Sequence, residues 1–172
     1  MFKTKTPIAV FALLALFALL QAGVREKDVP DDAVLLTGKG VAIEALLADT
    51  DAERIQGLSG KEELRKNEGM LFVFPKAAFH GIWMKDMLFP IDIIWLNDIN
   101  RKPQNDANET QKYAEGRTLI IVDIEENAGP ETFPEVFYPK EPAAYVLELP
   151  AGFMKKENLT VGDIITIEKT RH

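Results

Sequence analysis

The sequence predicts an α+β fold, in which a curled, mostly antiparallel sheet closes into a small barrel or sandwich with one or two short helices. Short apolar segments with strand-like alternation recur along the chain, and helix signals are few and brief. A nearly continuous apolar stretch at residues 80–96 holds both tryptophans and one of the two histidines. We therefore expect the rest of the domain to be organised around this stretch.

The first 22 residues have the composition of an export signal. Lys3 and Lys5 precede an unbroken apolar run at residues 8–20, with no acidic residue among them. The run is too short for a standard membrane-spanning helix, so we expect a signal peptide at residues 1–22 and export to the periplasm or the extracellular space. Because Leu20 lies where a small residue is preferred before the cut, an uncleaved N-terminal membrane anchor is the alternative.

The charge and the cysteine content exclude several classes of function. Removal of Lys3 and Lys5 with the signal leaves 18 basic and 27 acidic residues, a net charge of about −9. This charge argues against nucleic acid and against stable membrane insertion after signal cleavage. Cysteine is absent, which excludes disulfides, thiolate metal sites and a cysteine nucleophile. No cofactor is expected.

Two capping patterns predict the helices. Thr50 followed by Glu53 is typical of a capping box and predicts a short helix at residues 53–58. The pattern repeats at residues 59–62, and Gly69 would end the segment that follows.

Alternation of apolar residues predicts the strands. Residues 23–40 read as a linker with a first short strand at 34–37. Residues 98–116 are polar and aperiodic, which predicts a flexible inserted loop. The expected core residues are Leu71, Phe72, Ile93, Trp95, Ile121, Val146, Leu147 and Ile165. The other predicted strands are residues 41–48, 70–74, 80–84, 91–96, 117–124, 144–149 and 164–167.

The stretch at 80–96 reads as two strands with Lys85 and Asp86 at the corner between them. Both faces of the second strand are apolar, so Asp92 would be buried and would need a partner. Lys85 and the amides of the corner are the nearest candidates in sequence. The alternative is that Asp92 lies at the mouth of the strand in water.

Six short blocks, in order, resemble a known family. They are Gly57-Leu58-Ser59, Gly69-Met70-Leu71-Phe72-Val73-Phe74, Trp83-Met84-Lys85-Asp86, Pro90-Ile91-Asp92-Ile93, Glu126-Asn127-Ala128 and Tyr145-Val146-Leu147-Glu148-Leu149-Pro150-Ala151-Gly152. Together they resemble the small, exported prokaryotic proteins of the domain of unknown function 192 (DUF192). The resemblance covers most of residues 41–168 and implies a single compact α+β domain, but no established activity and no catalytic residue. Residues 98–116 and 130–142 look longer than the family pattern.

Acidic residues within apolar strands form the first candidate site. They are Glu44, Asp92, Asp123 and Glu148. If they converged, they could bind a divalent cation, work as an acid–base pair or neutralise Lys85 or Arg54 in a structural network. Acids on half-covered strands would simply face water. No EF-hand spacing occurs, and no metal is expected.

The corner itself forms the second candidate. His80, Trp83, Lys85 and Asp86, with Asp92 and Glu148, make up the expected ligand-binding set. Trp83 beside Gly81 would form an apolar platform for a sugar or peptide, or would pack in the core. Ser59 and His80 lie in no nucleophile-elbow pattern, so a serine triad is not expected.

The function that fits these observations is a monomeric, non-enzymatic binding module for a small ligand or an envelope protein. A carboxylate-dependent hydrolase or lyase acting on envelope glycan or peptide is one alternative, and a structural accessory domain is another. The enzyme alternative requires Asp92 and Glu148 to approach within about 5–10 Å, the separation of cooperating carboxyl groups.

Overall fold

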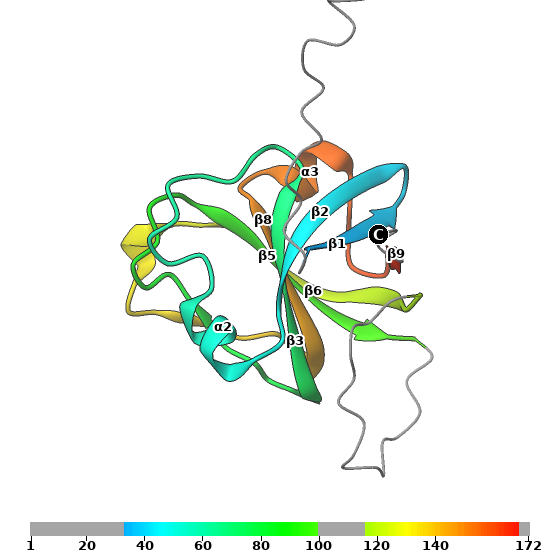
Figure 1. Ribbon diagram of the computed structural model, residues 1–172, viewed down its shortest axis with the longest axis horizontal. Helices are drawn as coiled ribbons and strands as arrows, with labels where there is room; N and C mark the ends of the chain where they lie inside the picture. The colour runs from blue at the N-terminus through cyan, green and yellow to red at the C-terminus, as the bar shows by residue number, and fades with distance from the viewer. Residues whose placement is uncertain (1–32, 100–115, 169–172) are drawn as a thin grey trace, which may run out of the picture. The chain divides into compact units, whose positions relative to one another are not determined.

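Seven strands close into a barrel in the computed structural model, which describes residues 33–99 and 116–168 (Figure 1). The barrel order is β1-β2-β3-β8-β5-β6-β9. All pairs are antiparallel except β2 with β3, and β1 closes the barrel by pairing with both β2 and β9. The predicted fold class is confirmed. The strands are β1 Ala33–Gly38, β2 Val41–Ala48, β3 Glu68–Ala78, β5 Ile91–Asp98, β6 Thr118–Ala128, β8 Ala143–Pro150 and β9 Ile164–Glu168.

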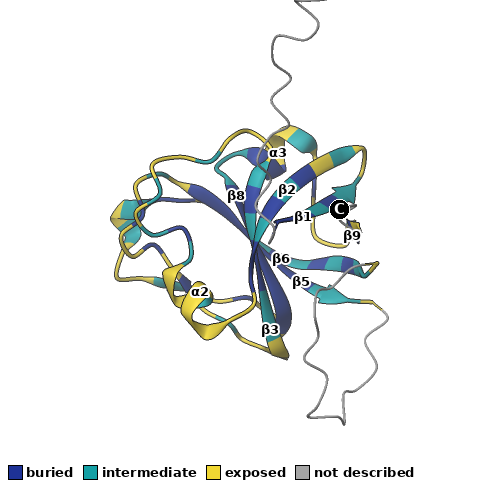
Figure 2. Cartoon of the chain, viewed as in Figure 1, coloured by how far each residue is buried: buried dark blue, intermediate teal, exposed yellow. Residues whose placement is uncertain are grey.

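The barrel has two apolar clusters, one on each face of its central strands. Residues from all seven strands fill the interior, where Leu36, Ile94 and Leu147 are fully buried. A second cluster covers the outer face of β3, β5 and β8. Figure 2 shows β5 and β8 buried along most of their length. All eight expected core residues are buried, which confirms that prediction.

Three segments outside the barrel pack against the second cluster and form an outer layer over it. We use this name for residues 57–66, 79–90 and 129–142. It contains β4 Ile82–Trp83 and β7 Val136–Phe137, which form a separate two-stranded sheet, and the 3-10 helix η1 Pro130–Thr132. The layer residues in or against the cluster are Leu58, Leu64, Ile82, Met84, Met87, Phe89 and Phe137.

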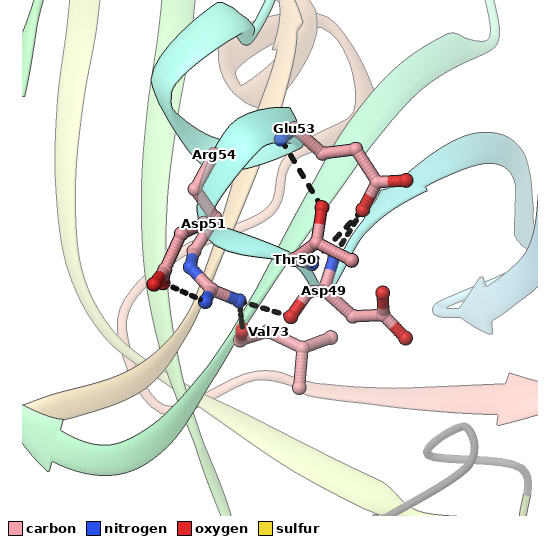
Figure 3. Close-up of polar contacts among 6 residues, drawn as sticks. All are labelled: Asp49, Thr50, Asp51, Glu53, Arg54 and Val73. Carbon is pink, nitrogen blue, oxygen red and sulfur yellow. Dashed lines mark hydrogen bonds and ion pairs between the residues drawn. The ribbon is translucent and has the colours of Figure 1, made fainter.

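Helix α2, Asp51–Gln56, begins with the predicted capping box (Figure 3). The Glu53 amide donates to Thr50 Oγ1 at 3.2 Å, and Glu53 Oε2 accepts from the Thr50 amide at 2.9 Å. Arg54 then anchors the helix, because its Nη1 donates to the carbonyls of Asp49 and Val73. The helix lies two residues earlier than predicted and ends at Gly57, whose φ is +50°.

The second helix signal is wrong. Residues 59–67 form turns and extended chain, because Ser59 Oγ donates to the Lys85 carbonyl at 2.9 Å and caps no helix. Gly69 lies in β3, where a Cβ would stand 2.7 Å from the Glu148 carbonyl oxygen, so close strand approach requires the glycine. The second α-helix is α3, Phe153–Glu157.

Two further expectations are met in part. Of the predicted strand at residues 80–84, residues 82–83 form β4, which pairs with β7 and not with the barrel. The first short strand predicted at residues 34–37 is confirmed as β1, but β1 is a barrel strand, so the expected linker at 23–40 extends too far. The predicted signal at 1–22 lies outside the described residues, as does most of the predicted loop at 98–116.

Trp95 joins the barrel to the outer layer, and its replacement tests this arrangement. The side chain is fully buried, and its Nε1 donates to the His80 carbonyl at 2.9 Å. We expect Trp95→Ala to lower the free energy of unfolding by about 3–5 kcal/mol. Trp95→Phe, which loses the hydrogen bond but fills much of the space, should be clearly milder. Urea denaturation followed by far-UV circular dichroism measures both, and a loss below about 1 kcal/mol for Trp95→Ala would contradict the buried position.

Candidate functional site

Asp92 is completely buried, and its partners are backbone amides. Oδ1 accepts from the Asn127 amide at 2.9 Å and from the Gly152 amide at 3.0 Å, and Oδ2 accepts from the Met154 amide at 2.9 Å. The expected partnership with Lys85 or the corner amides is therefore wrong, and so is the placement of Asp92 in water. The carboxylate holds three chain segments together and has a structural role.

Glu148 points to the opposite side of the sheet. In an antiparallel pair, residues directly opposite each other share a face. Asp92 pairs with Leu149, whose side chain is in the interior cluster, whereas Glu148 pairs with Ile93 of the outer cluster. The two acids therefore do not converge, contrary to the requirement of an acid–base pair.

The Glu148 carboxyl group is buried and has no partner among the described residues. The residue is 5% exposed, and its side chain makes no hydrogen bond or ion pair with any residue that the structure describes. Within this part of the chain no completely buried side-chain oxygen lacks a partner, so the carboxyl oxygens keep a narrow contact with solvent. Burial raises the pKa of Glu148 to about 8. Glu148 is therefore mostly a neutral acid at pH 7.

The other strand acids are accounted for individually. Asp123 accepts from the Lys140 amide at 2.8 Å and pairs with Lys140 Nζ at 2.9 Å. Although burial alone would raise the pKa of Asp123, the Lys140 hydrogen bonds hold it below the ordinary value. Glu44 lies on β2, partly buried. Residues 33–99 and 116–168 contain no group of three His, Cys, Asp or Glu side chains that could hold a metal ion.

Trp83 lies on the outward face of the small β4–β7 sheet. The inward face, Ile82 and Phe137, packs on the outer cluster. Trp83 alternates with Ile82, so its side chain points outward, and it is 50% exposed. It therefore belongs to the surface and not to the core.

Two further aromatic residues adjoin Trp83 on this face. The Phe133 ring lies edge-on to Trp83, with centroids 6.2 Å apart. Tyr138 lies over Gly81, where a Cβ would stand 2.6 Å from the tyrosine ring. Phe133 and Tyr138 are 44% and 62% exposed. We call Trp83, Phe133 and Tyr138 the aromatic platform.

The remaining corner residues surround the platform in different ways. Lys85 Nζ lies 5.8 Å from the Trp83 ring centroid and adds a positive charge at its edge. His80 stacks on Phe74, with centroids 3.6 Å apart, and its Nε2 lies 2.9 Å from the Lys76 carbonyl. Asp86 is exposed and has a φ of +56°, and its carbonyl accepts from the Gly60 amide.

Of the six expected site residues, the structure thus brings Trp83 and Lys85 together. Asp86 follows them in the turn, His80 packs on the barrel side, and Asp92 and Glu148 lie elsewhere. Sequence reasoning missed Phe133 and Tyr138, which come from the proline-containing segment at 129–142. The sequence feature that could have indicated them is the presence of large aromatic residues in a segment that lacks the alternating pattern of a strand.

The Asp92 contacts predict the effect of its substitution. Asp92→Asn removes one acceptor and places an NH₂ group among amide donors, so we expect a loss of about 1–3 kcal/mol. Asp92→Leu leaves all three amides without an acceptor and should cost more. Chemical denaturation at pH 7 measures both, with Glu63→Gln, which changes an exposed carboxylate, as the control, expected within about 0.5 kcal/mol of the parent. An Asp92→Leu variant as stable as the parent would refute the structural role.

Comparisons with known proteins agree with this fold. A "UPF0127 protein" of Thermococcus gammatolerans is 29% identical over 129 residues, which are 72% of this chain and 66% of that protein. The chain thus spans just under two-thirds of that relative's length. A Sinorhizobium meliloti 1021 crystal structure, described as a "putative transcription regulator", has a TM-score of 0.60 and 28% identity, over 78% of this chain and 91% of that chain.

A crystal structure of a protein of unknown function from Novosphingobium aromaticivorans DSM 12444 also has a TM-score of 0.60. It is 26% identical, over 77% of this chain and 82% of that one. No helix in the described part of this chain is long and apolar enough to cross a membrane. The family DUF192, described as an uncharacterized ACR, matches residues 34–167. The six motif blocks, the barrel and this match lead to one conclusion, that the chain belongs to the DUF192 family.

Proposed function

We propose that this protein is a non-enzymatic binding module whose ligand rests on the aromatic platform. The observation that carries the proposal is the half-exposed Trp83, held on the outward face of β4–β7 with Phe133 edge-on to it. Large aromatic side chains gain most from burial, so three of them gathered on one exposed face favour an interaction site.

The chemistry of the platform favours an acidic saccharide. The C–H faces of a sugar ring pack well on flat aromatic surfaces, and sugar hydroxyls remain in contact with water at such an open site. Lys85, beside the Trp83 ring, offers a cation to a carboxylate on the same ligand. A short oligosaccharide that carries a carboxylate matches both features.

Two other functions have less support. An acid–base hydrolase or lyase would need cooperating carboxyl groups, but Asp92 and Glu148 point to opposite faces. DNA binding would place a chain with a net charge of −7 against a polyanion. A structural accessory domain remains the alternative if the platform binds nothing.

Tryptophan fluorescence tests the platform directly, because Trp95 is buried and ligand-dependent changes report on Trp83. Titration with an acidic oligosaccharide should give a saturable change. We expect Trp83→Ala and Tyr138→Ala to weaken binding at least tenfold, measured for these variants by calorimetry. Lys85→Ala should weaken binding of the acidic ligand but not of its neutral analogue.

Ile55→Ala is the matched control, since Ile55 is a 76% exposed apolar residue on α2 and not a platform residue. It should bind as the parent does. Unchanged saccharide binding in Trp83→Ala would refute the platform, and binding of an apolar peptide in place of any saccharide would refute the ligand class.

We also propose export, supported by the Lys3 and Lys5 region and the apolar run at residues 8–20. The expected product in the native host is a mature protein that begins near Gly23, in the periplasm or outside the cell. Mass spectrometry of the purified native protein measures its N-terminus. A full-length product in the cytoplasm would contradict export, and a full-length product in the membrane fraction would favour the uncleaved anchor.

A further inference from the structure

Glu148 is buried on the outward face of the sheet, the face against which the outer layer packs. A side chain on the outward face of a barrel strand is exposed to water unless another segment packs over it. Glu148 shares this face with Val146, and its cross-strand neighbours are Met70 on β3 and Ile93 on β5. All three belong to the outer cluster or pack against it, and layer residues complete that cluster. A carboxyl group therefore lies within the apolar contact between barrel and layer.

The same contact supports the aromatic platform. Ile82 and Phe137, on the inward face of β4–β7, pack against the outer cluster, and Trp83 alternates with Ile82 on the outward face. Polar contacts in the described chain reinforce this packing. Trp95 Nε1 donates to the His80 carbonyl, and Asn97 Nδ2 donates to the Pro142 carbonyl. Three ion pairs also join layer to barrel: Lys140 with Asp123, and Lys61 and Arg65 with Glu68. The layer is therefore attached by the apolar contact together with these polar contacts.

We propose that Glu148 is a proton-controlled regulator of the aromatic platform: its neutral form lets the outer layer close on the barrel, and its ionisation favours an open state in which the layer detaches and the platform loses its support. The regulatory role rests on the proposed binding function of the platform, but the movement of the layer does not.

The surrounding charges do not compensate an ionised Glu148. The acidic groups on this face of the sheet are Glu44 on β2, Glu68 on β3, and Asp123 and Glu125 on β6. The basic or titratable groups over it are Arg54 of α2 and Lys61, Arg65, His80, Lys85 and Lys140 of the layer. Arg65 is paired with Glu68 and Lys140 with Asp123, while His80 stacks on Phe74. Strand β5 contributes none on this face. Lys61 is paired with Glu68 at 3.4 Å, and Lys85 is exposed beside Trp83. Burial is the one cause of the raised pKa of Glu148, so no nearby cation stabilises its charge.

The direction of the pH effect follows from proton linkage. The closed state binds the proton more tightly, because its Glu148 pKa is about 8, whereas hydration in the open state returns the pKa towards the ordinary value of 4.5. Closure is therefore most favoured below pH 4.5 and weakens as the pH rises. The ratio of open to closed molecules should increase up to about tenfold per pH unit between pH 4.5 and 8, and level off above that.

Trp95 reports on this opening. It lies one cross-strand row from Glu148, opposite Val146, and its indole donates to a carbonyl of the layer. In the Trp83→Phe variant Trp95 is the sole tryptophan. We expect its acrylamide quenching constant to rise several-fold between pH 5 and 8.5 while the far-UV circular dichroism stays constant. In Trp83→Phe/Glu148→Gln, which has no titrating proton at this position, the rise should be absent.

Glu125→Gln in the same background is the matched control, since it removes a carboxylate from the same face near its edge, and it should keep the rise. Equal pH profiles with and without Glu148→Gln would overturn the proposal, and so would loss of far-UV signal together with the quenching, which would mean global unfolding. A saccharide titration of the parent at pH 5.5 and 8.5 completes the test. If quenching follows Glu148 but no saccharide binds at either pH, the layer movement stands and the proposed binding function fails.

Discussion

The arrangement of the barrel depends on how the Asp92 carboxylate is satisfied. A charge with no exposure to water is tolerated only when hydrogen bonds replace its hydration. Asp92 receives three, from the end of β6 and from both sides of the start of α3. Two of the donors, Asn127 and Gly152, have φ values of +57° and +78°. The negative charge of the carboxylate stabilises the left-handed turns whose amides bind it. Strand β5 therefore fixes where β6 ends and where α3 begins.

Because α3 starts at this carboxylate, Phe153 and Met154 enter the interior cluster. The other face of β5 is then free to pack against the outer layer, and residues 91–96 are buried on both sides. Each buried acid near this strand is accommodated differently. Asp92 binds amides, Asp123 binds Lys140 at the edge, and Glu148 has neither kind of partner and keeps its proton.

The predictable part of this structure is the part that local pattern determines. Alternation placed β2, β5 and β8 and the core positions, and Thr50 with Glu53 placed α2, because hydrophobic periodicity and caps act over a few residues. The partner of Asp92 lies 35 to 62 residues away, in turns whose geometry no local pattern specifies. The position of residues 80–84 outside the barrel could not be predicted for a related reason: their apolar pattern is real, but it fits the outer layer as well as a barrel strand. Trp83 and Lys85 could be predicted as site residues because they lie in the apolar stretch at residues 80–96. Phe133 and Tyr138 join them only through the pairing of β4 with β7, which the sequence does not reveal.

The division between barrel and layer also means that the platform residues can be substituted without disturbing the barrel. Asp92, whose substitution is expected to destabilise the barrel, is completely buried and is held by three backbone amides. The platform residues stand on a two-stranded sheet that packs through Ile82 and Phe137, so their outward faces can change at little cost to the barrel. Such a two-stranded sheet is only marginally stable alone. Its packing on the barrel therefore depends strongly on the buried Glu148 carboxyl group at that contact. Placing an unpaired acid at that contact weakens the closed state as the pH rises, while the seven-stranded barrel beneath retains its own interior cluster.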